Sequence, residues 1–96
     1  KLDDSFAEAH FQVGVCRVEL DRIAEATASF ERAVVLKPGL PQARFNLVTG
    51  LLKQARYSDA LGHLEALASE NPNDIQVQQY LRFTRSKLGE IAKPQP

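Results

Sequence analysis

The sequence is poor in the residues and runs that define several protein classes. It has a single cysteine, Cys16, among 96 residues, which excludes an internal disulfide framework and any zinc site built from several cysteines. No apolar run approaches the ~18 residues that a membrane-spanning helix needs, and no secretory signal pattern stands at the start. Twelve basic residues balance twelve acidic ones, so the net charge does not favour nucleic acid or an anionic membrane as a ligand.

Residue patterns for catalysis or cofactor binding are lacking as well. His10 and His63 are far apart in the sequence, and neither has a cysteine or a pair of acidic residues at metal-ligand spacing. The five glycines form no phosphate-binding loop, because none follows a strand with further glycines at the required spacing. We therefore interpret the chain as non-catalytic, with no cofactor and no bound metal.

Apolar residues recur at helical spacing. Ala9, Val13, Cys16 and Leu20 are separated by four, three and four residues, which places them on one face of a helix. This stripe predicts that Cys16 is a buried, inert thiol. Strand-like alternation is absent, so an all-α fold is expected. Similar spacing between turn signals predicts five helices, at roughly 6–20, 23–36, 41–54, 57–70 and 74–88.

The breaks between these segments repeat along the chain. Pro38 and Pro72 each end a predicted helix, and they lie 34 residues apart, as do Phe30 and Leu64. Connections this short predict that neighbouring helices are antiparallel. One pair of amphipathic helices cannot bury its apolar face alone, so the repetition indicates stacked pairs.

A 34-residue helix–turn–helix unit of this kind resembles the tetratricopeptide repeat (TPR). Residues 7–40 and 41–74 are similar to full units, and residues 75–91 are similar to the first helix of a third and form a cap-like end. The resemblance makes residues 1–6 the remnant of a preceding unit. It implies that residues 1–96 are a single domain, a right-handed superhelical array of antiparallel helix pairs (an α-solenoid). The matching positions are Ala9, Val13, Gly14, Ala26, Phe30, Ala33 and Pro38, then Ala43, Leu47, Tyr57, Ala60, Leu64 and Pro72, then Val77, Leu81, Gly89 and Ile91.

The sequence departs from the family pattern at several positions. His10 and Arg44 stand where the family has a tryptophan, and Val48 stands where it keeps a glycine that lets the two helices of a unit approach closely. These departures affect the expected helix spacing in the second unit rather than the expected architecture.

The first helix of each unit has a second stripe, with i, i+4, i+7 spacing, that its partner helix cannot cover. In TPR proteins this face lines a concave groove that holds a peptide or helix of a partner, and exposed aromatic and branched side chains there favour an apolar segment. The alternative is that these side chains only pack helix against helix. The predicted groove residues are Phe11, Val15, Val18, Phe45, Asn46, Thr49, Leu52 and Phe83.

One ligand class of the family is disfavoured. TPR modules that bind acidic C-terminal tails of chaperones use a clamp of lysine, asparagine and arginine, and only Asn46 survives at the corresponding positions. The resemblance implies that Asn46 hydrogen-bonds the backbone of a bound peptide, and a hydrogen bond within the fold is the alternative.

The sequence thus predicts a protein–protein interaction module, part of a larger scaffold protein, with a protein or peptide partner, no nucleic acid and no membrane insertion. The alternative is a structural spacer or self-association segment within a multi-domain enzyme or export assembly. If a preceding unit is missing, the first helix should leave apolar side chains uncovered, which would favour weak homo-oligomers.

Overall fold

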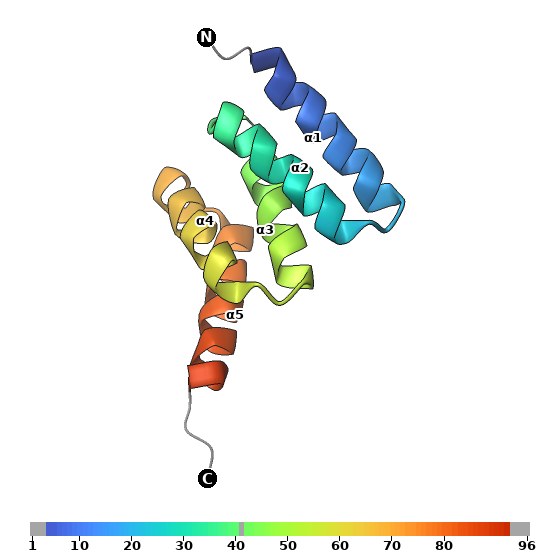
Figure 1. Cartoon of the computed structure of the whole chain (residues 1–96). Coiled ribbons are helices and arrows are strands. Elements are labelled where there is room, and N and C mark those ends of the chain that lie inside the picture. Colours follow the sequence, from blue (N-terminus) through green and yellow to red (C-terminus); the bar gives the residue numbers. More distant parts are fainter. Residues whose placement is uncertain (1–3, 41, 93–96) are drawn as a thin grey trace.

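The protein is a row of helices. The structure, a computed structural model, describes residues 4–40 and 42–92, and across these residues it contains helices and turns but no strand. The all-α, TPR-like fold predicted from the sequence is confirmed. The five helices are α1 (Asp4–Glu19), α2 (Ile23–Leu36), α3 (Ala43–Lys53), α4 (Tyr57–Glu70) and α5 (Ile75–Ala92) (Figure 1).

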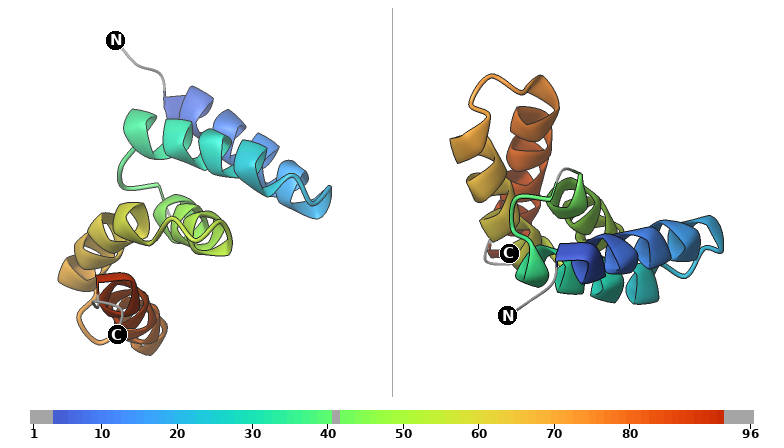
Figure 2. Two further views of the ribbon diagram at one scale, coloured as in Figure 1. Left: turned by 60° about the horizontal axis from the view of Figure 1, so that its bottom comes forward. Right: turned by 90° about the horizontal axis from the view of Figure 1, so that it is seen from above.

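Each helix packs on the next one along the chain. Figures 1 and 2 show that consecutive helices lie side by side and run in opposite directions, so the chain advances as a zigzag. The molecule is accordingly elongated, with extents of 51 × 30 × 23 Å. This arrangement puts α1, α3 and α5, the first helices of the three predicted units, in alternate places along the row.

The turns within the two helix pairs repeat in backbone detail. Asp21 and Ala55, which are 34 residues apart, both adopt the left-handed conformation, with φ of 60° and 57°. The following amide nitrogen then donates to a carbonyl five residues back, from Arg22 to Arg17 at 2.8 Å and from Arg56 to Leu51 at 2.9 Å. This is the hydrogen bond of a helix C-terminal motif that needs a left-handed residue, so the repeat is present in the backbone as well as in the side chains.

The predicted helix ends agree with the structure to within two residues, except at the end of α5. A break was expected at Gly89, but α5 continues through it to Ala92. A lone glycine costs a helix only about 1 kcal/mol relative to alanine, and Lys87 and Glu90 form an ion pair across this turn at 3.8 Å. α1 begins at Asp4, so residues 4–6 extend it, while residues 1–3 of the predicted remnant lie outside the described residues.

The core lies between the helices in two adjoining clusters. The first joins α2 to α3 and α4 through buried side chains such as Phe30, Leu47 and Leu51. The second joins α3, α4 and α5 through Val48, Leu64, Val77 and Leu81. Leu52 packs against both clusters.

A volume exchange accounts for the departure at Val48. In the first unit, a Cβ atom added to Gly14 would lie 2.6 Å from Cε1 of Phe30, so the glycine leaves room for the aromatic ring. At the equivalent positions of the second unit, Val48 and Leu64 share the second cluster. The second unit thus has more side-chain volume on its first helix (valine for glycine) and less on its second (leucine for phenylalanine), which preserves close packing in both units.

The outer face of α1 is uncovered. Phe6 and Leu20 are 60% and 64% exposed, and Val13 is also exposed. Cys16 lies on the same face and is exposed, so the prediction of a buried thiol is wrong. The stripe was identified correctly as apolar, but α2 packs on the other side of α1, where Ala7 and Gly14 are buried, and none of the described residues covers Cys16.

Candidate functional site

A first hollow, of about 190 Å³, lies where α1 and α2 meet α3. Four of the predicted groove residues line it, and its floor is formed by core side chains of α2, including Phe30. The surface of this hollow is mostly apolar, with Glu19 and Lys53 as its charged residues. The residues around it are Val15, Val18, Glu19, Ile23, Ala26, Phe30, Asn46, Thr49, Gly50 and Lys53.

A second hollow, of about 490 Å³, lies between α3 and α5. Its lining residues are Thr49, Leu52, Lys53, Gln79, Tyr80 and Phe83. Thr49 and Lys53 line both hollows. Since these two residues are one helical turn apart, both hollows border the same face of α3. We call the two hollows together the groove face.

Two predicted groove residues line neither hollow. The ring of Phe11 lies 5.8 Å from that of Phe30 and packs on the first core cluster. Phe45 stacks on Tyr80 at 5.4 Å between ring centroids, with an interplanar angle of 17°. Phe45 instead borders a separate hollow of about 330 Å³ beside the loops that connect the units. The contacts of Phe11 are those of one helix packing on another, which is the alternative interpretation of the groove residues.

Lys53, Ile23 and Tyr80 line the hollows but were not predicted. The 34-residue repeat could have identified Tyr80, because it is equivalent to Asn46. It also relates Lys53 to Glu19 and Lys87, one residue in each unit at the end of the groove stripe. Ile23 begins α2 and gave no such signal, because it belongs to the second helix of its unit.

The polar groups of the groove face differ in their hydrogen bonding. The hydroxyl of Thr49 donates to the carbonyl oxygen of Phe45 at 3.1 Å. The carboxamide of Asn46 is half-buried and forms no hydrogen bond with any described residue. A half-buried amide without a partner in the fold is available to a ligand. A ligand that covers it is expected to supply a hydrogen bond, because leaving such a group unpaired in a dry interface is costly.

The charges along the groove face are unevenly distributed. Lys53 is exposed and forms no ion pair with any residue of 4–40 or 42–92. Lys87 lies 5.7 Å from the centroid of the Phe83 ring at the α5 end, within the range of a cation–π contact. Glu19 lines the first hollow, at the α1 end. The charged side chains of the face are therefore acidic at the α1 end and basic at α3 and α5.

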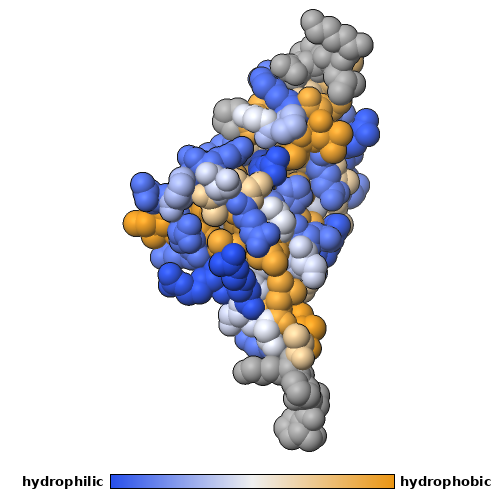
Figure 3. Space-filling model, turned by 90° about the vertical axis from the view of Figure 1, so that its left-hand side faces the viewer, coloured by the Kyte–Doolittle hydropathy of each residue, from blue (hydrophilic) through white to orange (hydrophobic). Residues whose placement is uncertain are grey.

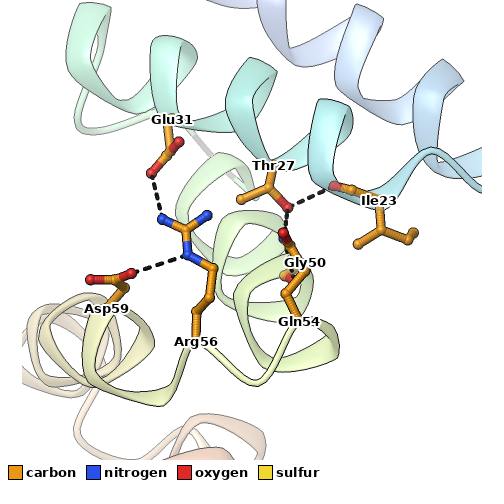
Figure 4. A network of polar contacts seen from close by, with 7 residues as sticks. All are labelled: Ile23, Thr27, Glu31, Gly50, Gln54, Arg56 and Asp59. Atoms are coloured by element: carbon orange, nitrogen blue, oxygen red, sulfur yellow. Dashed lines mark hydrogen bonds and ion pairs between the residues drawn. The ribbon is translucent and has the colours of Figure 1, made fainter.

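A polar network fixes α3 against α2 below the first hollow (Figure 4). The hydroxyl of the fully buried Thr27 donates to the carbonyl oxygen of Ile23 at 2.8 Å and accepts from Nε2 of Gln54, also at 2.8 Å. Nε2 of Gln54 also donates to the carbonyl oxygen of Gly50 at 3.0 Å. A Cβ atom at Gly50 would collide with the Thr27 hydroxyl, so the glycine permits this close approach of the two helices.

A second group of charged residues lies where α2, α3 and α4 meet. Arg56 joins α2 to α4, with 3.8 Å to Glu31 and 3.1 Å to Asp59 (Figure 4). Burial lowers the pKa of His63 below its ordinary value of 6.5, and the neighbouring Arg44 lowers it further, while Glu31 and Asp59 oppose the shift. Among the described residues, no three His, Cys, Asp or Glu side chains are grouped so that they could hold a metal ion.

Apolar side chains also reach the surface outside the groove face. Figure 3 shows hydrophobic groups exposed near both ends of the chain. Phe6 on α1 and Ile91 on α5 are exposed apolar residues that line neither hollow of the groove face. None of the helices in the described part of the chain combines the length and hydropathy needed to span a membrane.

Comparison with families of known proteins finds a match. A family model described as tetratricopeptide repeat matches residues 17–82, which is more than half of the chain. No curated protein and no solved structure matches the sequence.

Proposed function

The chain belongs to the tetratricopeptide repeat family, whose members generally act as protein–protein interaction modules, and from this premise we propose that it binds a peptide or helix of a partner on the groove face. The module is non-catalytic and belongs to a larger scaffold protein. The observation that carries the proposal is the pair of largely apolar hollows that share Thr49 and Lys53 on one face of α3.

The chemistry of the groove face supports an apolar segment as its ligand. Val18 and Phe83 are 41% and 45% exposed, and each lines one hollow. Covering exposed apolar surface is favourable by about 25 cal/mol per Å², and such surface at a concave site is typical of interaction sites. The unpaired carboxamide of Asn46, at the edge of the first hollow, supports an additional hydrogen bond to the backbone of the ligand.

The test is an affinity pull-down with the isolated domain and three variants. Val18→Ser and Phe83→Ser each remove an exposed apolar side chain from one hollow, and Val35→Ser removes one from α2, where Val35 is 69% exposed and lines neither hollow. Phe45→Ala is a poorer test, because Phe45 lines neither hollow and stacks on Tyr80. The Phe83 ring also meets that of Tyr57 at 6.2 Å, so Val18→Ser is the cleaner of the two groove variants.

We expect proteins captured by the wild type to be lost from Val18→Ser and Phe83→Ser and retained by Val35→Ser. Circular dichroism should show equal helix content in all four proteins. Capture that is unaffected by both groove variants would contradict the proposal, and it would favour the alternative of a spacer or self-association segment.

A further inference from the structure

We infer that the partner segment presents an acidic side chain between two apolar ones and that Lys53 recognises the acidic group. This inference rests on the proposed function of the groove face and adds the chemistry of its ligand.

The two hollows lie on either side of the same short stretch of α3. Val15, Val18 and Ile23 contribute apolar groups to the first hollow, and Leu52 and Phe83 contribute them to the second. Thr49 and Lys53 lie between, because they line both. A segment that fills both hollows must therefore cross this ridge, with one apolar side chain on each side of it and the intervening residue above it.

Lys53 is the residue of the ridge that can select for charge. It is exposed, and none of the residues described by the structure forms an ion pair with it. Thr49 cannot select in this way, because its hydroxyl already donates to the carbonyl oxygen of Phe45. Apolar ligand groups on both sides of Lys53 would exclude water from its surroundings, which strengthens its attraction to a carboxylate and penalises a cationic or unpaired neighbour.

The other charges of the groove face restrict where the acidic residue lies. No carboxylate lines the second hollow, whereas Glu19 lines the first. Lys87 is beside Phe83 at the α5 end and is partly neutralised by its ion pair with Glu90 at 3.8 Å. An acidic group is thus repelled at the α1 end and attracted over the ridge. The selected segment is apolar, then acidic, then apolar.

The first part of the test is selection from a phage-displayed library of random 12-residue peptides. The targets are the wild-type domain, Lys53→Glu as the charge reversal, and Arg32→Glu as a matched control. Arg32 is an exposed residue of α2 that lines neither hollow, so the control changes the net charge equally. Val18→Ser and Phe83→Ser serve as competitor targets that identify peptides bound at the groove face.

We expect peptides selected by the wild type and by Arg32→Glu to be enriched in Asp or Glu between apolar residues, and those selected by Lys53→Glu to lose this enrichment.

The second part of the test measures the binding of a selected peptide and of its Glu→Gln or Asp→Asn derivative. The neutral derivative should bind the wild type about fivefold more weakly or worse, since about fivefold is the upper end for an exposed ion pair and the exclusion of water strengthens the pair. It should bind Lys53→Gln as well as the parent peptide does.

The possible failures are distinguishable. Peptides that depend on Val18 but show no acidic enrichment, or that lose affinity equally on the wild type and Lys53→Gln when neutralised, would overturn the inference and leave the proposed function standing. If no selected peptide depends on Val18 or Phe83, the groove face is not a binding site, and both the proposed function and this inference are wrong.

Discussion

At Gly14 the missing side chain determines how closely α1 approaches α2. Because an added Cβ atom would lie 2.6 Å from the Phe30 ring, and this ring is 1% exposed within the core, Gly14→Ala should force the ring or the helix to move. Overpacking of this kind costs about 1–3 kcal/mol. Urea denaturation followed by circular dichroism measures the loss.

Two comparisons separate packing from a general effect of alanine. Gly62 lies in α4 with nothing within 4 Å of an added Cβ atom, so Gly62→Ala should stabilise the protein by about 0.5–1 kcal/mol. The double variant Gly14→Val/Phe30→Leu copies the Val48–Leu64 pair of the second unit and should be more stable than the sum of the two single effects predicts. Additive effects would show that the volume exchange between the units is incidental.

His63 should make the stability depend on pH. Its pKa is lowered in the folded protein, first by burial and then by Arg44, so below about pH 6.5 the unfolded chain binds a proton that the folded protein does not yet bind. The free energy of unfolding should therefore fall as the pH is lowered from about 7.5 towards 5. In His63→Gln this slope should be smaller, and an unchanged slope in urea titrations would contradict the assignment.

How far single residues could be predicted from the sequence depended on what surrounds them. Periodicity identified the apolar face that contains Cys16, but not which side of α1 is covered, because that depends on a neighbouring helix. Six of the eight predicted groove residues line the two hollows of the groove face, whereas Phe11 and Phe45 line neither of these and contact other rings. Spacing gives the face of a helix on which a side chain lies, and it does not determine which rings stack once the helices have packed.

At the scale of whole helices the sequence was more informative. Proline positions and the 34-residue repeat predicted five helices, and the ends of the first four were correct to within two residues. The error at Gly89 arose because a helix end is decided by the balance between small local costs and neighbouring contacts, which one glycine does not determine. The equivalent left-handed residues Asp21 and Ala55 were not predicted to be left-handed, because neither is a glycine or asparagine.

The last helix provides an element-scale prediction. α5 places Val77 and Leu81 in the second core cluster, and its exposed residues include both Arg82 and Arg85 and the apolar Ile75, Phe83 and Ile91. Leu81→Ala should cost about 2–5 kcal/mol by leaving a cavity beside Leu64. Ile91→Ala, at a site that is 69% exposed on the same helix, should change the stability by less than about 0.5 kcal/mol. Similar losses from both variants, measured by urea denaturation, would contradict this assignment of the buried face.

At the scale of the whole molecule, the two ends of the row differ. Arg82 and Arg85 are exposed on α5, with Arg85 3.6 Å from Glu65, and residues 75–96 contain four basic side chains and one acidic side chain. Residues 1–36 contain four basic and seven acidic side chains, and α1 exposes Phe6, Val13 and Leu20 on its outer face. Opposite charges at opposite ends favour head-to-tail contact between copies over contact between like ends.

We therefore expect the isolated chain to self-associate weakly through the outer face of α1. A stable interface buries about 1,200–2,000 Å² in total, more than the outer face of one helix supplies, and each exposed ion pair adds at most about 1 kcal/mol. Sedimentation velocity from micromolar to millimolar concentration should show a gradual rise in mean mass. Leu20→Lys should abolish that rise, because it places a positive charge in the apolar contact and opposite the basic end of the other copy, and Val35→Lys on α2 should leave it unchanged. A strict monomer over the whole range, or a rise that persists in Leu20→Lys, would contradict association through this face.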